Sequence, residues 1–365
     1  MSQTPNGTPR ADGFRMPAEW EPHEQCWLIW PENGYAWREG ARPAQRALAE
    51  LANAIAETGE QVTVTATGPA YPHARTLLSD RVRLLTMDVV LGWARDIAPT
   101  FVVDDEGRRR AVAWRFNGYG QLYPHWQRDS QYAFKVMDAE RTAGYVAPLV
   151  VEGGGFHVDG EGTCLVTAET LLDPARNPGL GTDAIDAELG RYLGADTVIW
   201  LERGLTHDET KGHIDNMACF TAPGEVCLSW TDDESDPQYE RGAEALARLE
   251  SATDARGRSL TVHKLPLPGP LSSTEEEDRT VDQIVPRPYG GHRLPASYTN
   301  FYVANGHVFA PLLDPERDDE AHKILGELFA DREVVGLATR ELLLGGGNIH
   351  CATQQIPMPR VRGEA

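Results

Sequence analysis

The chain has 365 residues, 41% of them hydrophobic and 24% charged, a composition typical of a globular protein with one large or two ordinary domains. Its 55 acidic residues outnumber its 34 basic residues, which gives a formal net charge of −21. This excess argues against nucleic acid as a partner, because phosphate binding needs a basic face, and it suits a small cationic substrate. No apolar run approaches the roughly 18 residues of a membrane-spanning helix, so no membrane partner is expected.

The first 15 residues are polar, contain proline and glycine, and lack the apolar core of a secretory signal. We predict that residues 1–15 form a disordered tail and that residues 16–365 form a single domain. The chain has five cysteines, an odd number that favours free thiols over a disulfide framework. Free thiols indicate a reducing compartment, so we expect a cytoplasmic protein.

The predicted secondary structure repeats along the chain in the order strand, strand, helix, strand. Only the first unit is incomplete, because a single strand precedes its helix. A long polar stretch at 272–283 reads as a loop inside one unit rather than as a linker between domains. The five predicted units lie at residues 26–65, 100–151, 156–201, 217–265 and 299–337.

The fourth unit shows the pattern most clearly. Its strands are expected at 217–221 and 225–230, followed by a helix at 237–251 with apolar residues at roughly helical spacing and a strand at 260–265. In the fifth unit, Asn305-Gly306 between two strands is a strong signal for a two-residue hairpin turn. The order of elements predicts an α/β protein.

Four segments between these elements concentrate reactive side chains. The first is Trp93-Ala94-Arg95-Asp96, the second is Glu152 followed by three glycines, and the third, 206–216, contains three acids and two histidines. The fourth is a glycine run that follows a strand-like apolar stretch at 341–344 and ends in Cys351. Glycines let the backbone approach a ligand closely, so Cys351 is placed like a nucleophile, although by itself it could be an ordinary buried thiol.

Together these residue types indicate a particular chemistry. A nucleophilic cysteine needs a partner that stabilises its thiolate and moves protons, and histidine is the usual choice near neutral pH. One carboxylate is enough to orient a histidine. Further carboxylates indicate a cationic substrate, because a carboxylate pair can hold a planar guanidinium through charge-assisted hydrogen bonds.

These segments resemble the agmatine deiminases (agmatine iminohydrolases), members of the guanidino-group-modifying, or pentein, superfamily. The resemblance covers nearly the whole chain, and the order and spacing of its motifs make chance an unsatisfactory explanation. The motifs lie at residues 16–23, 93–99, 114–117, 152–155, 171–174, 176–178, 212–216, 228–240, 297–302, 346–351 and 354–355. The resemblance implies a five-bladed α/β propeller of ββαβ units with pseudo-fivefold symmetry around a central site, in agreement with the five predicted units.

The resemblance also implies an activity and a set of roles. The reaction would be the hydrolytic deimination of agmatine to N-carbamoylputrescine and ammonia, in putrescine and polyamine biosynthesis, through a covalent cysteine–amidino intermediate. Cys351 would be the nucleophile, His213 the general acid and base, and Glu152 the carboxylate that orients His213. Asp96 and Asp215 would clamp the guanidinium. No metal or other cofactor is implied.

Two further residues are expected to contact the substrate. Glu209 would bind the distal ammonium of agmatine, and Trp93 would either wall its methylene chain or pack in the core. The sequence departs from the family pattern at Lys211, where Asp or Asn is usual, and at Ile97-Ala98, where Thr-Gly is common. Lys211 would weaken agmatine binding or favour a substrate with a carboxylate if it faces the site, and would change nothing if it points to solvent.

Several alternatives remain open at this point. The same chemistry would serve a deiminase acting on arginine or another guanidino compound, and an amidinotransferase would share the covalent intermediate. A non-catalytic binding module is disfavoured because Cys351 and His213 are both present. For His157, His207 and His350 we expect structural or supporting roles. Family resemblance suggests a homodimer or higher homo-oligomer.

Overall fold

A computed structural model describes residues 7–279, 281 and 290–358, and these residues contain five separate β-sheets. In four of the sheets an antiparallel strand pair is extended by a third strand parallel to the second. A parallel connection needs a crossover, and in each case a helix provides it. The strands are β4 (Thr100–Val103), β5 (Arg109–Arg115), β6 (Gly144–Val150), β7 (Phe156–Val158), β8 (Thr163–Thr167), β9 (Thr197–Leu201), β10 (Ala218–Ala222), β11 (Glu225–Trp230), β12 (Thr261–Pro266), β13 (Tyr302–Ala304), β14 (His307–Leu312) and β15 (Glu333–Ala338). The crossover helices are α5 (Tyr132–Ala139), α7 (Thr182–Leu193), α8 (Pro237–Glu250) and α10 (Asp318–Leu328).

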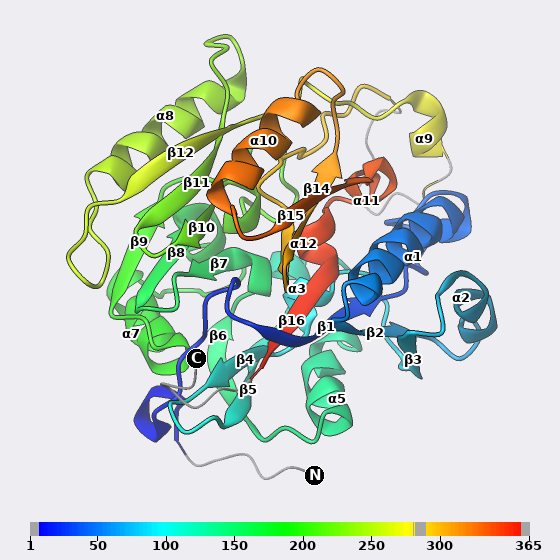
Figure 1. The fold of residues 1–365 in the computed structure, drawn as a ribbon, viewed down its shortest axis with the longest axis horizontal. Coiled ribbons are helices and arrows are strands. Elements are labelled where there is room, and N and C mark those ends of the chain that lie inside the picture. The colour runs from blue at the N-terminus through cyan, green and yellow to red at the C-terminus, as the bar shows by residue number, and fades with distance from the viewer. Residues whose placement is uncertain (1–6, 280, 282–289, 359–365) are drawn as a thin grey trace.

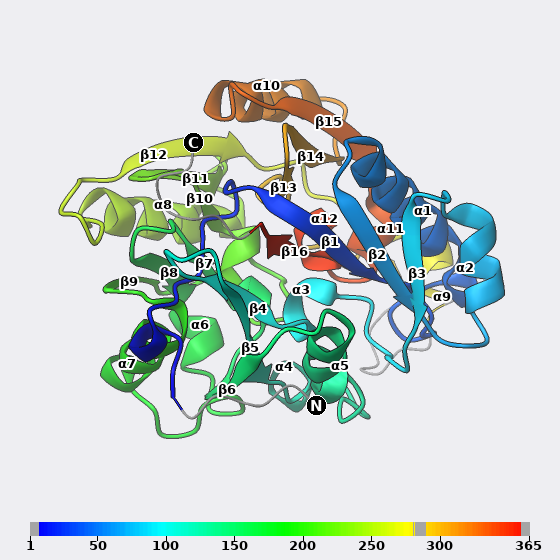
Figure 2. The same cartoon turned by 60° about the horizontal axis from the view of Figure 1, so that its bottom comes forward.

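The fifth sheet joins the two ends of the described chain. Its strand order is β16-β1-β2-β3, with β16 antiparallel to β1 and the other pairs parallel. Figure 2 shows β16 lying beside β1. The strand missing from the first predicted unit is therefore supplied from the C-terminal part of the chain. The elements are β1 (His23–Ile29), α1 (Arg42–Glu57), β2 (Gln61–Ala66), α2 (Tyr71–Leu77), β3 (Val82–Thr86) and β16 (Thr353–Pro357).

Short helices lie in the connections. In Figure 1, α3 and α12 lie near the middle of the molecule, whereas α1, α5, α7, α8 and α10 lie toward its rim. The stretch 341–344 belongs to helix α11, so the strand-like interpretation is wrong: its three leucines favour a helix, and Leu342 and Leu343 are buried. The α-helices of this kind are α3 (Ala94–Ile97), α4 (Gly118–Gln121), α6 (Ala168–Leu171), α9 (Glu275–Arg279), α11 (Arg340–Leu344) and α12 (Ile349–Ala352), and the 3-10 helices are η1 (Arg10–Asp12), η2 (Glu39–Ala41), η3 (Asp129–Gln131), η4 (Gly153–Gly155) and η5 (Ile214–Asn216).

The described chain is ordered before residue 16, the predicted start of the domain. Phe14 is 2% exposed within a core cluster, and Arg15 forms a β-bridge with Val103. One aromatic side chain and a strand edge are enough to hold this polar segment, so the predicted tail is too long. Residues 1–6 of that prediction, and 280 and 282–283 of the predicted loop, lie outside the described residues.

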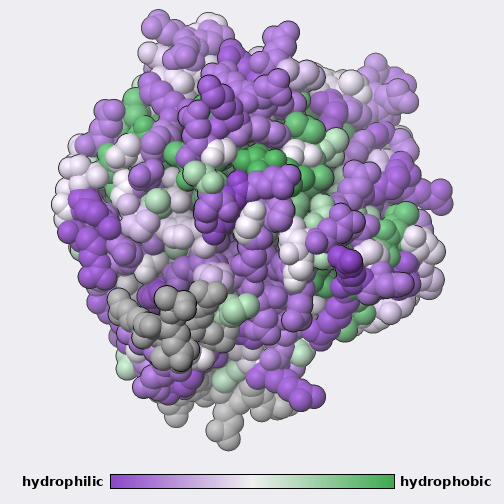
Figure 3. Space-filling model, viewed as in Figure 1, coloured by the Kyte–Doolittle hydropathy of each residue, from purple (hydrophilic) through white to green (hydrophobic). Residues whose placement is uncertain are grey.

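The core is formed where the sheets and helices meet, and the surface is polar. Cys26, Cys164, Cys219 and Cys227 are buried in strands, and these four and Cys351 are all free thiols. Figure 3 shows one face that is mostly hydrophilic, with smaller hydrophobic areas between the hydrophilic residues. Across the described ranges, we find no helix with the length and apolarity needed to cross a membrane.

Candidate active site

Cys351 lies in α12, a single helical turn that follows the glycine run. The side chain of Asn348 caps this turn by accepting the N–H of Ile349 at 3.0 Å. A Cβ atom on Gly347 would lie 3.0 Å from both the Cys351 Cβ and the Trp93 ring, so any larger residue there would push against both side chains. Asn300 fixes the cysteine from the other side: its Nδ2 donates to Sγ at 3.2 Å, and its Oδ1 accepts the Cys351 N–H at 3.3 Å.

Asp215, in η5, is the carboxylate nearest the sulfur. The Cys351 thiol donates to Asp215 Oδ2 over 3.4 Å, and Cys351 is 5% exposed. Burial raises the pKa of the Cys351 thiol well above its usual value, and the negative charges of Asp215 and Asp96 raise it further. The protein therefore holds Cys351 as a thiol until a positive charge enters the site.

His213 lies between two carboxylates. Its Nε2 is 3.2 Å from Glu152 Oε2 and its Nδ1 is 3.7 Å from Asp96 Oδ1. Burial alone would lower the pKa of His213, but Asp96, Glu152 and Asp215 raise it to about 9. His213 is thus an imidazolium at neutral pH, ready to donate a proton.

Asp96, in α3, is held by two donors. The Tyr119 hydroxyl donates to Oδ2 at 2.7 Å, and the Gly154 N–H donates to Oδ1 at 3.2 Å. Burial raises the pKa of Asp96; His213 opposes this, but the nearby Asp215 and Glu152 carboxylates help to bring it to about 6. Asp96 is therefore mostly ionised at neutral pH and protonated in mild acid.

Gly154, in η4, lies where these groups converge. A Cβ there would be 2.6 Å from His213 Nδ1, 2.9 Å from Asp215 Oδ2 and 3.1 Å from Asp96 Oδ1. No real Cβ comes this close, so the glycine makes room for three reactive side chains at once. The glycine run after Glu152 thus shapes the site as directly as the run before Cys351.

Two buried atoms at this centre have no hydrogen-bond partner among the described residues: Asp215 Oδ1 and His213 Nδ1. Buried polar atoms are normally partnered, so these two indicate where a ligand binds. The carboxylate oxygen can only accept, so it calls for a donor, and a guanidinium supplies several on one rigid plane.

A pocket leads from the cysteine toward the surface. Its inner part is lined by Trp93, Asp96, Tyr119, Tyr123, Glu209, Thr210, Gly345, Gly346, Gly347 and Cys351. Glu209 accepts the Tyr123 hydroxyl at 3.3 Å, and both residues also line a wider cavity outside. Trp93 meets Trp37 at 5.1 Å between ring centroids, so it packs in the core and lines the pocket at the same time. The sequence-predicted site residues are thus brought together in space.

Known proteins share this sequence and fold. The sequence profile of the family described as Porphyromonas-type peptidyl-arginine deiminase matches residues 15–357. The chain is 51% identical to an agmatine deiminase of Pseudomonas aeruginosa (strain UCBPP-PA14), with 98% of this chain and 99% of that protein covered. It is 49% identical to the agmatine deiminase of Pseudomonas syringae pv. syringae (strain B728a), with the same coverage. This chain belongs to the agmatine deiminase family.

A solved structure supports the assignment at the level of the fold. The agmatine deiminase of Enterococcus faecalis, described as catalysing its reaction, superposes with a TM-score of 0.95 at 39% identity. The match covers 99% of this chain and 100% of that one. The mixed α/β fold of the agmatine deiminases therefore extends over essentially the whole molecule.

The two departures from the agmatine deiminase pattern lie outside the pocket lining. The Lys211 Nζ is 2.7 Å from Asp173 Oδ2, and its side chain is 51% exposed. Ile97 and Ala98 are buried in a core cluster at the end of α3. Neither departure brings a carboxylate-binding group to the inner pocket, whose lining contains none of the three residues.

Sequence reasoning assigned no role to several residues that hold the site. Arg176 donates from Nε to both Glu152 oxygens at 3.2 and 3.0 Å. Burial raises the pKa of Glu152, but Arg176 and His213 lower it by more, so the pKa lies below its ordinary value. Tyr119 and Asn300 hold Asp96 and Cys351. Arg176 and Asn300 lie inside the family motifs at 176–178 and 297–302. The presence of a charged or amide residue within a motif was the sequence signal that could have identified them.

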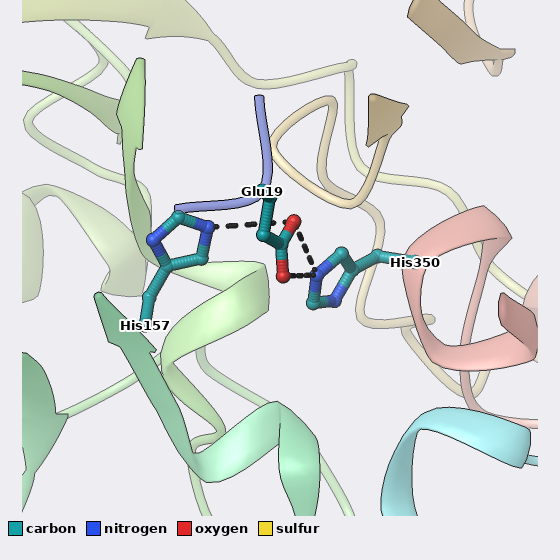
Figure 4. Close-up of side chains that lie close together, drawn as sticks. All are labelled: Glu19, His157 and His350. Atoms are coloured by element: carbon teal, nitrogen blue, oxygen red, sulfur yellow. Dashed lines mark hydrogen bonds and ion pairs between the residues drawn. The ribbon is translucent and has the colours of Figure 1, made fainter. Parts of the chain in front are cut away.

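A further buried cluster lies beside the site. Figure 4 shows Glu19 between His157 and His350, and one ligand-type atom from each lies within 4.8 Å of the others. The donors around them fit an ion-pair cluster better than a metal site. Arg95 donates to Glu19 at 3.1 Å, and the Phe220 N–H occupies Nδ1 of His157, which leaves the ring proton on the nitrogen that faces Glu19.

Proposed function

We propose that this protein is an agmatine deiminase, which hydrolyses agmatine to N-carbamoylputrescine and ammonia as a step in putrescine and polyamine biosynthesis. Family membership supports the activity. The observation that carries the assignment of residues is the buried constellation of the Cys351 thiol, the His213 imidazolium and the Asp96 and Asp215 carboxylates at the end of one pocket.

Binding of the substrate cation would also activate the nucleophile. The guanidinium lies between Asp96 and Asp215 and donates hydrogen bonds to Asp215 Oδ1 and to the Asp96 carboxylate. Its positive charge offsets the two carboxylates that raise the pKa of the Cys351 thiol, so the thiol releases its proton to solvent and the thiolate forms when substrate is bound. Trp93 flanks the methylene chain.

The first half of the reaction replaces ammonia by sulfur. The Cys351 thiolate attacks the guanidinium carbon and forms a C–S bond, giving a neutral tetrahedral adduct. The His213 imidazolium transfers its proton to one –NH2 group, the C–N bond breaks, and ammonia leaves. A cationic S-alkylthiouronium remains on Cys351, and Asp96 and Asp215 stabilise its charge.

The second half replaces sulfur by water. Neutral His213, oriented by Glu152, takes a proton from water as the oxygen attacks the thiouronium carbon. The adduct collapses, the C–S bond breaks, and the Cys351 thiolate leaves. The remaining hydroxyl proton goes to the released ammonia, so agmatine and water give N-carbamoylputrescine and ammonium.

Selectivity for agmatine over arginine would come from the negative charge of Glu209, where the inner pocket meets the wider cavity. Glu209 lines both the inner pocket and the wider cavity outside it, so it would face the distal amine of agmatine and favour an ammonium. The α-carboxylate of arginine would face this acid without a partner, and a buried unpaired charge is strongly penalised. Lys211 does not relieve that penalty, because it is engaged by Asp173.

Ammonia release from agmatine, arginine and other guanidines, by wild type and Lys211→Asn, tests the proposal. We expect kcat/KM for agmatine to exceed that for arginine at least 100-fold, with Lys211→Asn within threefold of wild type. Chelation should not reduce activity. If arginine is turned over as efficiently as agmatine, and Lys211→Asn selectively removes the activity on arginine, then the substrate assignment is wrong and only the deiminase chemistry stands. Amidination of an added amine in place of ammonia-linked hydrolysis would indicate an amidinotransferase.

The same proposal extends to the assembly of the molecule. Four sheets share one strand order, and the fifth has the same order in β16-β1-β2 with β3 added at its edge. We take the five sheets as blades of a five-bladed propeller with pseudo-fivefold symmetry, with residues 16–365 acting as one catalytic domain. We also retain the cytoplasmic location, which suits free thiols, and a homodimer or higher homo-oligomer. Sedimentation equilibrium of the purified protein measures the oligomeric state.

A further inference from the structure

His350, the residue before the proposed nucleophile, lies between two buried carboxylates. Its Nδ1 is 2.9 Å from Asp215 Oδ2, and its Nε2 is 2.9 and 3.1 Å from the two oxygens of Glu19. A neutral imidazole has one donor and one acceptor nitrogen, and an acceptor facing a carboxylate would be repelled. Both nitrogens therefore donate, and His350 is an imidazolium.

This contact fixes one end of the Asp215 carboxylate. Oδ2 receives both the His350 N–H and the Cys351 thiol, whereas Oδ1 has no partner among the described side chains. A carboxylate anchored through one oxygen presents the other in a fixed direction. His350 thus orients the Asp215 oxygen that the mechanism assigns to the guanidinium.

Glu19 reaches this centre from the segment before β1, far from Cys351 in the chain. It is 6% exposed, accepts from Arg95 Nη1 at 3.1 Å, and faces His157 Nε2 at 3.6 Å (Figure 4). Burial raises the pKa of Glu19, but the positive charges of His350 and Arg95 outweigh it and leave the pKa well below its usual value. Glu19 is therefore an anion that holds the His350 proton.

We propose that Glu19 and His350 are positioning residues of the deiminase site: Glu19 keeps His350 positively charged, and His350 orients Asp215 and balances its charge beside Cys351. This inference rests on the proposed function. Neither residue contacts the guanidinium in the mechanism, so each would act through Asp215.

The balance of charge gives the reason for such an arrangement. The groups facing His350 are Glu19, Asp215, Arg95 and His157. Without the His350 charge, Asp215 would lose its only cationic hydrogen-bond donor in the described protein and would lie, buried, beside a sulfur that must become an anion. Asp215 would then be an uncompensated anion that no charged donor holds through Oδ2, which weakens the guanidinium clamp and raises the pKa of the Cys351 thiol further.

Three purified variants test this: His350→Asn, Glu19→Gln and the double variant. Asparagine keeps a donor near the position of Nδ1 but removes the charge. We expect kcat/KM for agmatine to fall at least 100-fold for His350→Asn and about tenfold for Glu19→Gln. The double variant should be within threefold of His350→Asn, because Glu19 acts through the histidine.

Two further readouts separate positioning from general damage to the fold. In Glu19→Gln the His350 proton is held less tightly. The alkaline limb of the pH profile, where kcat/KM falls because His350 loses its proton, should therefore lie about one pH unit lower than in wild type. Alkylation of Cys351 by iodoacetamide, followed by mass spectrometry, should be at least tenfold slower in His350→Asn at pH 8. His157→Asn is the matched control: it removes the other histidine facing Glu19, whose second nitrogen is occupied by Phe220, and should stay within threefold of wild type.

Strict additivity of the two substitutions, or an unshifted alkaline limb in Glu19→Gln, would overturn the inference. If His350→Asn does not fold, Glu19→Gln and its pH profile decide alone. The proposed function fails separately, if wild type releases no ammonia from agmatine. Because alkylation needs no substrate, the effect on Cys351 is measured in either case.

Discussion

Two glycine runs with nearly the same sequence serve the site in different ways. Gly153-Gly154-Gly155-Phe156-His157 leads into strand β7, whereas Gly345-Gly346-Gly347-Asn348-Ile349-His350 leads into the helical turn α12. Both runs end in a histidine that faces Glu19 (Figure 4). Only the second leads directly to a cysteine, the proposed nucleophile Cys351.

The one additional residue of the second run, Asn348, accounts for the difference. Its side chain caps a helical turn, and successive side chains on such a turn point about 100° apart. His350 can therefore face Glu19 and Asp215 while Cys351 faces the pocket. On strand β7, His157 is followed by Val158, which is buried in the core. The capping residue Asn348 therefore explains why one glycine run leads to a helical turn that carries Cys351, whereas the other leads into a strand.

The strongest way to break the second run is Cys351→Ser. We expect turnover of agmatine to fall at least 10⁴-fold while the melting temperature changes little, because a hydroxyl is a poor nucleophile without a strong base. Ammonia release and circular dichroism measure the two effects. Cys227→Ser, in strand β11, is the control and should keep its activity. Near-normal turnover by Cys351→Ser would remove the covalent mechanism.

Each run contacts one carboxylate of the proposed clamp, through Gly154 for Asp96 and through His350 for Asp215. Asp96→Asn and Asp215→Asn keep the shape but remove an anion. We expect each to lower kcat/KM at least 100-fold, on the order of 3 kcal/mol of transition-state stabilisation. Steady-state kinetics with agmatine measures it, and a loss below threefold at either position would make that carboxylate structural.

Substitutions in the first run, Gly153-Gly154-Gly155, test whether it matters for the space it leaves in the site or for folding. Gly154→Ala would place a methyl group against His213, Asp215 and Asp96, so we expect kcat/KM to fall about 30-fold. Gly155→Ala is a matched control, because its Cβ would meet only the methyl groups of Val151 and Thr170, at 3.3 and 3.4 Å. Equal losses in the two variants would show that the run matters for folding rather than for the space it leaves.

The pH dependence tests which protons the two runs control. The Cys351 thiol must lose its proton while His213 keeps its own, and the His213 pKa is about 9 with the thiol pKa above its usual value. We therefore expect kcat/KM to rise about tenfold per pH unit up to about 9. Below about 6 it should fall more steeply, because Asp96 is protonated there. A flat profile between pH 6 and 8 would mean that the free protein already holds a thiolate.

Local patterns predicted much of the fold. The limits of β11 agree with the sequence-based prediction, and those of β10, α8 and β12 differ from it by one residue, since their alternating or helical spacing and flanking turns are strong signals. The partner of β1 was not predictable in this way. β16 lies about 330 residues away, and nothing in its own sequence specifies that it pairs with β1.

The candidate site was predicted unevenly for a similar reason. Cys351, His213 and Asp215 stand in motifs whose residue types announce their chemistry. Glu19 lies in the motif at 16–23, whose residue types indicate no particular chemistry, and its importance comes only from burial against His350 and Arg95. The interpretation of Lys211 also needed the structure, because sequence cannot show that Asp173 binds it.

The pairing of β16 with β1 has a consequence for how the protein folds. Cys351 lies two residues before β16, and that strand is held by contact with a strand near the opposite end of the chain. Contacts so distant in sequence are slow to form, because a very long loop must close first. We therefore expect a refolding molecule to recover secondary structure early and turnover late, when the last strand closes the first sheet.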